Sequence, residues 1–230
     1  MSISPAMWRR SLKGSGLSSS DFLTDPLYVE KQPKEFASLE KWEQNNWEVF
    51  HWSTRSKLEA SIWFYGQIVG LGSIRHVWFT TVRFDSLLNW HLDAFFNELM
   101  SAFETLLQEV NVVHRCGLKR DKVTWEGKRG IKGCLSGKAG RMGEIIAAAY
   151  DNETFKDIRD WRNTVFHRHH IPKVSTDVGG GEVVRIKTTV ELVKTPSDPA
   201  QNVKLSKLAD YINLIAKLCM QVWEQLAEEK

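Results

Sequence analysis

Residues 84–110, FDSLLNWHLDAFFNELMSAFETLLQEV, are the part of the chain that decides its fold. Apolar side chains recur there at spacings of three and four, and acidic and amide side chains fill the opposite side, which is the pattern of an amphipathic helix. At 1.5 Å per residue this helix would be about 40 Å long. The segment therefore predicts one long pillar of a helical bundle, with His91 in its apolar stripe as a core residue.

Helical patterns flank this pillar on both sides. Upstream, the apolar residues between positions 36 and 65 predict one amphipathic helix that ends at the glycine-rich stretch 70–73. Downstream, a short helix is expected from residue 143. Asp151 and Asn152 then offer a turn and an N-cap. We expect the next helix over residues 153–167.

The end of the chain combines a hairpin with a last helix. Residues 183–193 are rich in β-branched side chains and partly alternate, as in a strand. The three glycines 179–181 provide a turn, and residues 171–176 the other arm. Residues 205–226 return to helical spacing. The sum is a mainly α protein, a helical bundle with a small β-hairpin before the C-terminal helix.

Length and composition are those of an ordinary folded domain. The chain has 230 residues, of which 42% are hydrophobic and 26% charged, and a formal net charge of +3. We expect an irregular N-terminal segment over residues 1–32 and one domain over 33–230. So small a charge does not by itself predict nucleic-acid binding. Charged residues interrupt the most apolar stretch, so no membrane contact is expected.

The cysteines indicate neither a metal site nor a disulfide framework. Cys116, Cys134 and Cys219 are odd in number, and no CxxC pair is present. Two neighbouring ligands, His114 and Cys116, do not make a zinc site. We therefore expect no cofactor, and a reducing, cytoplasmic location.

A basic, glycine-rich segment covers residues 117–143. It holds seven glycines, and eight basic residues against two acidic ones give it a local charge of +6. Such a composition predicts a long mobile loop. This loop is either an electrostatic funnel for a polyanion or a solubilising loop without a partner. Its basic residues are Lys119, Arg120, Lys122, Lys128, Arg129, Lys132, Lys138 and Arg141.

The residues with chemical potential gather in segment 159–170, which holds three arginines and three histidines. Charged residues at a helix end also interact favourably with the helix dipole, which needs no function. The functional reading is that His167 transfers protons, Arg162 binds a phosphate, and Asn163 fixes orientation. Because RNA supplies its own nucleophile, the 2′-hydroxyl, these residues would suffice for cleavage without a metal.

Helix geometry adds a condition to this site. Asn163 and His167 are four residues apart and share a face, whereas Arg162 and His167 lie about 140° apart on a regular helix. Either the helix end is distorted, or two copies of the chain meet and each site uses residues from both.

Arg162, Asn163 and His167, on a late helix of a bundle, resemble the signature of the HEPN superfamily, in which an Arg precedes a His by four to six residues and Asn often follows the Arg. The resemblance covers roughly residues 84–226. It implies a bundle of four or five core helices that dimerises to bring two motifs together. It also implies a metal-independent endoribonuclease of the kind found in toxin–antitoxin, abortive-infection and CRISPR systems.

The sequence therefore predicts an RNA-cleaving enzyme that works as a homodimer, with an antitoxin or regulatory protein as a possible partner in a toxin or antiviral defence context. His167 would act as acid or base, Arg162 would stabilise charge, and Asn163 would orient. The alternative is a non-catalytic dimerisation or binding module for a partner protein or a nucleotide. Further RNA contacts are expected from Arg159, Arg168, His169, Lys128, Arg129 and Lys132.

Overall fold

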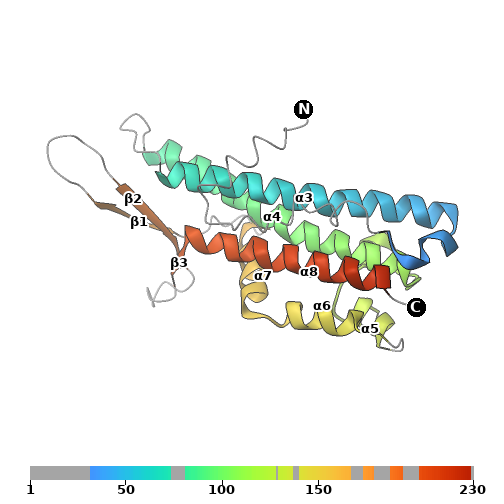
Figure 1. Ribbon diagram of the computed structural model, residues 1–230. Coiled ribbons are helices and arrows are strands. Elements are labelled where there is room, and N and C mark those ends of the chain that lie inside the picture. The colour runs from blue at the N-terminus through green and yellow to red at the C-terminus, as the bar shows by residue number, and fades with distance from the viewer. Residues whose placement is uncertain are drawn as a thin grey trace.

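Two antiparallel helices of 33 residues each form the axis of the structure (Figure 1). The computed structural model describes residues 32–73, 81–127, 129–136, 140–166, 173–178, 187–193 and 202–228. Its α-helices there are α3 (Lys41–Ser73), α4 (Thr81–Val113), α5 (Ile131–Leu135), α6 (Met142–Tyr150), α7 (Glu153–Phe166) and α8 (Leu208–Glu228), preceded by the 3-10 helix η1 (Lys34–Ser38). The prediction of a mainly helical bundle is confirmed.

Helix α4 is the central pillar, as its sequence predicts. Most of its apolar stripe is buried, because α3, α7 and α8 all pack against it, while Leu87 and His91 are partly exposed. Each large apolar side chain that is removed from water in this way stabilises the fold by roughly 1.5–3 kcal/mol. The fully buried members of the stripe include Leu88, Leu92, Phe95, Phe96, Leu99, Leu106 and Val110.

Helix α7 packs on α4 through one face. Asn152 Oδ1 accepts a hydrogen bond from the Thr154 backbone N–H at 2.8 Å, so the predicted cap starts the helix. Phe155 is fully buried, and its ring centroid lies 4.7 Å from that of Phe103 on α4 in an edge-to-face contact. Ile158 is also buried. This packing fixes which face of α7 remains for solvent.

The small sheet lies at one end of the bundle (Figure 1). β1 (Lys173–Val178) pairs antiparallel with β2 (Lys187–Leu192), which confirms the hairpin with arms shifted by a few residues. A third strand, β3 (Val203–Lys204), pairs with the end of β2. Two residues are too short to leave a periodic signal, so β3 has no counterpart among the predicted elements. The predicted glycine turn lies outside the described residues.

The prediction of a mobile loop over residues 117–143 was wrong. The segment contains the 3-10 helix η2 (Arg120–Lys122), the helix α5 and the start of α6, and it contributes five buried side chains to the main core. A Cβ at Gly130 would collide with the Glu126 carbonyl oxygen, so that glycine permits a close backbone approach. The segment joins a core that other helices build, which local composition does not reveal. Its buried apolar residues are Val123, Trp125, Ile131, Leu135 and Met142.

A disulfide joins Cys116 and Cys134, contrary to the expectation from the cysteine pattern. Their Cα atoms are 5.6 Å apart, although 18 positions separate them in sequence. The bond ties the residues that follow α4 to the helix α5. Cys219 on α8 is free and buried. The cysteines therefore no longer argue for a reducing compartment.

Within the described ranges, every helix is too short or too polar to cross a lipid bilayer.

Breaking the Cys116–Cys134 disulfide is expected to lower the free energy of unfolding by about 3 kcal/mol, because a closed loop restricts the unfolded chain. The measurement is urea unfolding of the wild type and of Cys134→Ser, each with and without dithiothreitol. The reductant should destabilise the wild type and leave the variant unchanged. Equal midpoints for both untreated proteins would contradict the expected stabilisation.

Candidate functional site

The predicted motif begins near the C-terminal end of α7 (Glu153–Phe166), where Arg162 lies at the edge of the face that packs on α4. Asn163 is exposed, and the side chain of Arg162 is 29% exposed. Arg162 Nη2 lies 3.6 Å from Glu104 Oε1 on α4, so a carboxylate partly neutralises it. His167, the third motif residue, falls outside the described residues, as do Lys128, Arg168 and His169.

Arg159, a predicted RNA contact, has a partner within the chain. Its Nη1 donates a hydrogen bond to the Tyr150 hydroxyl at 2.8 Å, and the guanidinium carbon lies 5.2 Å from the ring centroid of Tyr150. Burial raises the pKa of Tyr150, while the contact with Arg159 lowers it. Arg159 therefore joins α7 to α6, whatever else it contacts.

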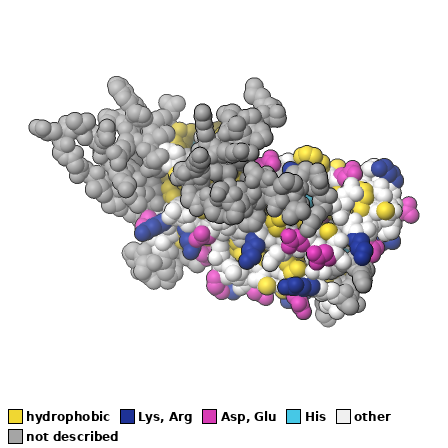
Figure 2. All heavy atoms as spheres, viewed as in Figure 1, with side chains coloured by type: hydrophobic (Ala, Val, Ile, Leu, Met, Phe, Trp, Pro, Cys, Tyr) yellow, Lys and Arg dark blue, Asp and Glu magenta, His cyan; other side chains and the backbone are white. Residues whose placement is uncertain are grey.

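The predicted basic contacts Arg129 and Lys132 are exposed around the start of α5. Because α5 is anchored by buried residues and the disulfide, these charges are held in fixed places and not spread along a loop. On the face that Figure 2 shows, acidic and basic side chains are interspersed over the described surface. Attraction of a polyanion would therefore depend on local charges and not on the net charge of the molecule.

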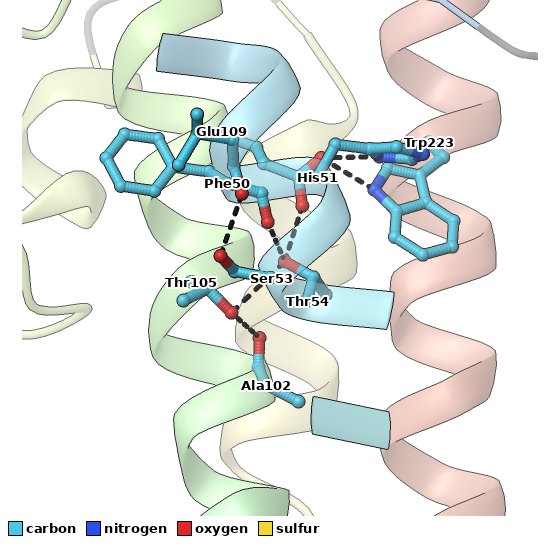
Figure 3. Close-up of polar contacts among 9 residues, drawn as sticks. Phe50, His51, Ser53, Thr54, Ala102, Thr105, Glu109 and Trp223 are labelled. Atoms are coloured by element: carbon cyan, nitrogen blue, oxygen red, sulfur yellow. Dashed lines mark hydrogen bonds and ion pairs between the residues drawn. The ribbon is translucent and has the colours of Figure 1, made fainter. Parts of the chain in front are cut away.

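A buried polar cluster, which sequence reasoning missed, lies between α3, α4 and α8 (Figure 3). Glu109 on α4 is completely buried, and its Oε2 accepts a hydrogen bond from Trp223 Nε1 at 2.8 Å. His51 Nδ1 lies 3.0 Å from the same oxygen. Thr54 Oγ1 donates to Glu109 Oε1 at 2.6 Å. We call these four side chains the Glu109 cluster.

Aromatic rings enclose this cluster. The His51 ring stacks on Trp47 with a centroid distance of 4.7 Å and meets Trp223 edge-on at the same distance. Thr54 Oγ1 also lies 3.1 Å from Thr105 Oγ1, which extends the hydrogen bonds along α4. Since His51 is only 7% exposed, a substrate has no access to the cluster in this arrangement. Its role is to hold three helices in register.

One signal in the sequence pointed to Glu109. It lies three residues after Leu106 and seven after Ala102, both fully buried, so it occupies the apolar stripe of α4. A carboxylate in that position must find hydrogen-bond donors, because burying an unpaired charge is costly. The donors come from α3 and α8, and no pattern within α4 identifies them.

A surface groove runs along α4, beside α3 and the segment that follows α4. It consists of two adjoining hollows that share Phe50, Gln108 and Arg120. One hollow extends to Glu104, the partner of Arg162, and the other to Trp42. The groove therefore reaches the immediate neighbourhood of the predicted motif.

Among the described residues, His, Cys, Asp and Glu side chains do not gather in threes or more in a way that could hold a metal ion. The motif residues that reach solvent in the described part of α7 are Arg162, with its guanidinium, and Asn163, with its amide. These groups bind and orient anions, and proton transfer would have to come from a further residue.

Removing one hydroxyl from the Glu109 cluster is expected to destabilise the bundle. Thr54→Val keeps the shape of the side chain but leaves Glu109 Oε1 without this donor, at a cost of about 1–3 kcal/mol. Ser53→Ala is the matched control, because Ser53 Oγ bonds only the Val49 carbonyl on an exposed part of α3. Its expected effect is within about 0.5 kcal/mol. Urea unfolding measures both, and equal losses would argue against a special role for the cluster.

Comparison with known proteins found no family model, no curated protein and no solved structure that matches the chain.

Proposed function

We propose that this protein is a metal-independent endoribonuclease of the HEPN type, with Arg162, Asn163 and His167 as its catalytic residues. The observation that supports this most is the placement of Arg162 and Asn163. Asn163 is exposed on α7, and Arg162 is partly exposed at the edge of the face that packs on α4 through Phe155 and Ile158. A rigid helix with one buried face keeps such side chains in a defined geometry, which catalysis requires.

The chemistry needs only these residue types. His167 removes the proton from the 2′-hydroxyl, whose oxygen attacks the adjacent phosphorus while the bond from phosphorus to the 5′-oxygen breaks. The leaving 5′-oxygen takes up a proton, and the products are a 2′,3′-cyclic phosphate and a 5′-hydroxyl. Arg162 stabilises the charge on the phosphate, and Asn163 orients the phosphate or His167.

A second copy of the chain is part of this proposal. Because Arg162 and His167 are five residues apart, a regular helix would point them about 140° from each other. A symmetric dimer allows each site to combine residues from both copies. An antitoxin or regulatory protein would control such an enzyme, in a toxin or antiviral defence context within the cytoplasm.

The second candidate function is a non-catalytic binding module. Its support is a set of large aromatic side chains exposed on α3 and α4, at 64% for Trp42, 63% for Trp52, 41% for Trp63 and 75% for Trp90. Exposed tryptophans are enriched in protein interfaces. On this reading, alanine substitutions in the motif change association or stability, and no variant or wild type cleaves RNA.

The ribonuclease proposal predicts cleavage of labelled RNA in the presence of EDTA. His167→Ala and Arg162→Ala should each lower the rate by about 10²–10⁴-fold, because they remove proton transfer or charge stabilisation. The cleavage rate of Asn163→Ala is compared with that of Asn45→Ala as a matched control, since both asparagines are exposed on helices. Gel analysis should show 2′,3′-cyclic phosphate ends. Undiminished cleavage by a folded His167→Ala protein would refute the assignment.

Glu104 should restrain the motif. Its carboxylate is 49% exposed and competes with a phosphate for Arg162. Since an exposed ion pair of this kind contributes up to about 1 kcal/mol, Glu104→Gln is expected to tighten RNA binding roughly two- to fivefold. Titration of a 2′-O-methyl RNA at low and high salt measures this. Weaker binding by the variant would mean that Glu104 positions Arg162 and does not compete for it.

A further inference from the structure

The groove on α4 is preformed, because side chains hold its outer wall in place. Asn111 Nδ2 donates to the Leu118 carbonyl at 3.0 Å, and the Leu118 N–H donates back to Asn111 Oδ1 at 3.1 Å. Gln108 Nε2 donates to the Arg120 carbonyl at 2.8 Å. The Cys116–Cys134 disulfide ties the same segment to α5. A wall fixed in this way does not have to be ordered when a ligand binds, which favours affinity.

The groove carries an aromatic ring that is open to solvent. Trp42 on α3 lines it and is 64% exposed. At the middle of the groove the guanidinium carbon of Arg120 lies 5.4 Å from the ring centroid of Phe50. Tryptophan and arginine are the side chains on which unpaired nucleobases stack, and arginine also contacts phosphates.

The carboxylates of the groove all have cationic partners. Arg115 Nη2 lies 3.2 Å from Glu43 Oε2, and Glu104 contacts Arg162. Asp121 faces Lys122 at 3.6 Å. These pairs reduce the repulsion that the carboxylates would exert on a polyanion, and Arg120 adds a positive charge between them.

The groove is in line with the motif. Glu104 and Asn111 both line it and are seven residues apart on α4, so about 10 Å of helix separates them. Arg162 contacts Glu104 at one end, and Trp42 marks the other end. A strand bound at Arg162 can therefore continue along α4 towards Trp42.

We propose that this groove binds single-stranded RNA next to the cleavage motif, with a base stacked on Trp42 and the backbone near Arg120. The inference takes its ligand from the proposed ribonuclease function. It specifies that the substrate is unpaired on one side of the cut, because a base within a duplex has no free face to stack on a side chain.

The test measures binding separately from cleavage. A fluorescent 2′-O-methyl oligonucleotide cannot be cut, and its anisotropy reports binding to the full chain. Trp42→Ala should weaken binding roughly five- to a hundredfold, whereas Trp42→Phe, which keeps an aromatic face, should restore most of it. Trp52→Ala is the matched control, because Trp52 is on the same helix, equally exposed at 63%, and absent from the groove lining.

The outcomes separate the two proposals. The groove proposal is supported if binding depends on Trp42 but not on Trp52 and favours the single strand over a hairpin duplex. If the protein binds in this way but leaves unmodified RNA intact, only the ribonuclease proposal is refuted. If His167→Ala abolishes cleavage but Trp42→Ala binds RNA as tightly as the wild type, the groove proposal is overturned and the ribonuclease proposal is supported. Absence of RNA binding by the wild type overturns the groove inference as well.

Discussion

The structure depends on one buried carboxylate. Glu109 lies on the pillar helix α4 and receives hydrogen bonds from Thr54 on α3 and Trp223 on α8, with His51 beside the same oxygen as Trp223. Burying a carboxylate inside a bundle costs free energy unless hydrogen-bond donors lie at the right positions. Any other relative position of these helices would separate Glu109 from its donors and destabilise the fold. Apolar contacts alone tolerate small slides of one helix along another, because they are not directional.

This constraint also shapes the groove on α4. With α3 held on α4 by the Glu109 cluster, Phe50 and Trp42 lie beside Gln108 and form the groove. Thr105 connects the groove with the cluster, since it lines the groove and lies within hydrogen-bond distance of Thr54. The same helix α4 buries the inner face of α7, with Arg162 at the edge of that face and Asn163 exposed.

The basic segment 117–143 shows how far composition alone can predict structure. Its glycines and charges indicated a loop, and its exposed arginines and lysines agree with that view. Five apolar residues nevertheless pack into the main core, and the Cys116–Cys134 bond closes the segment. Whether the few apolar residues of this segment become buried depends on the apolar surface against which they pack. That surface is made in part by α4 and α6, which pack against α5.

The sequence by itself determined the long helices, the hairpin and the position of Arg162 and Asn163 on α7, because helical and strand periodicity, caps and turns are local properties. Only the tertiary structure decided the partners of Glu109, the pairing of the cysteines, the groove beside Trp42 and the contact between Arg162 and Glu104. Each of these joins residues from different elements, and such contacts follow from how helices pack, which no single stretch of sequence encodes.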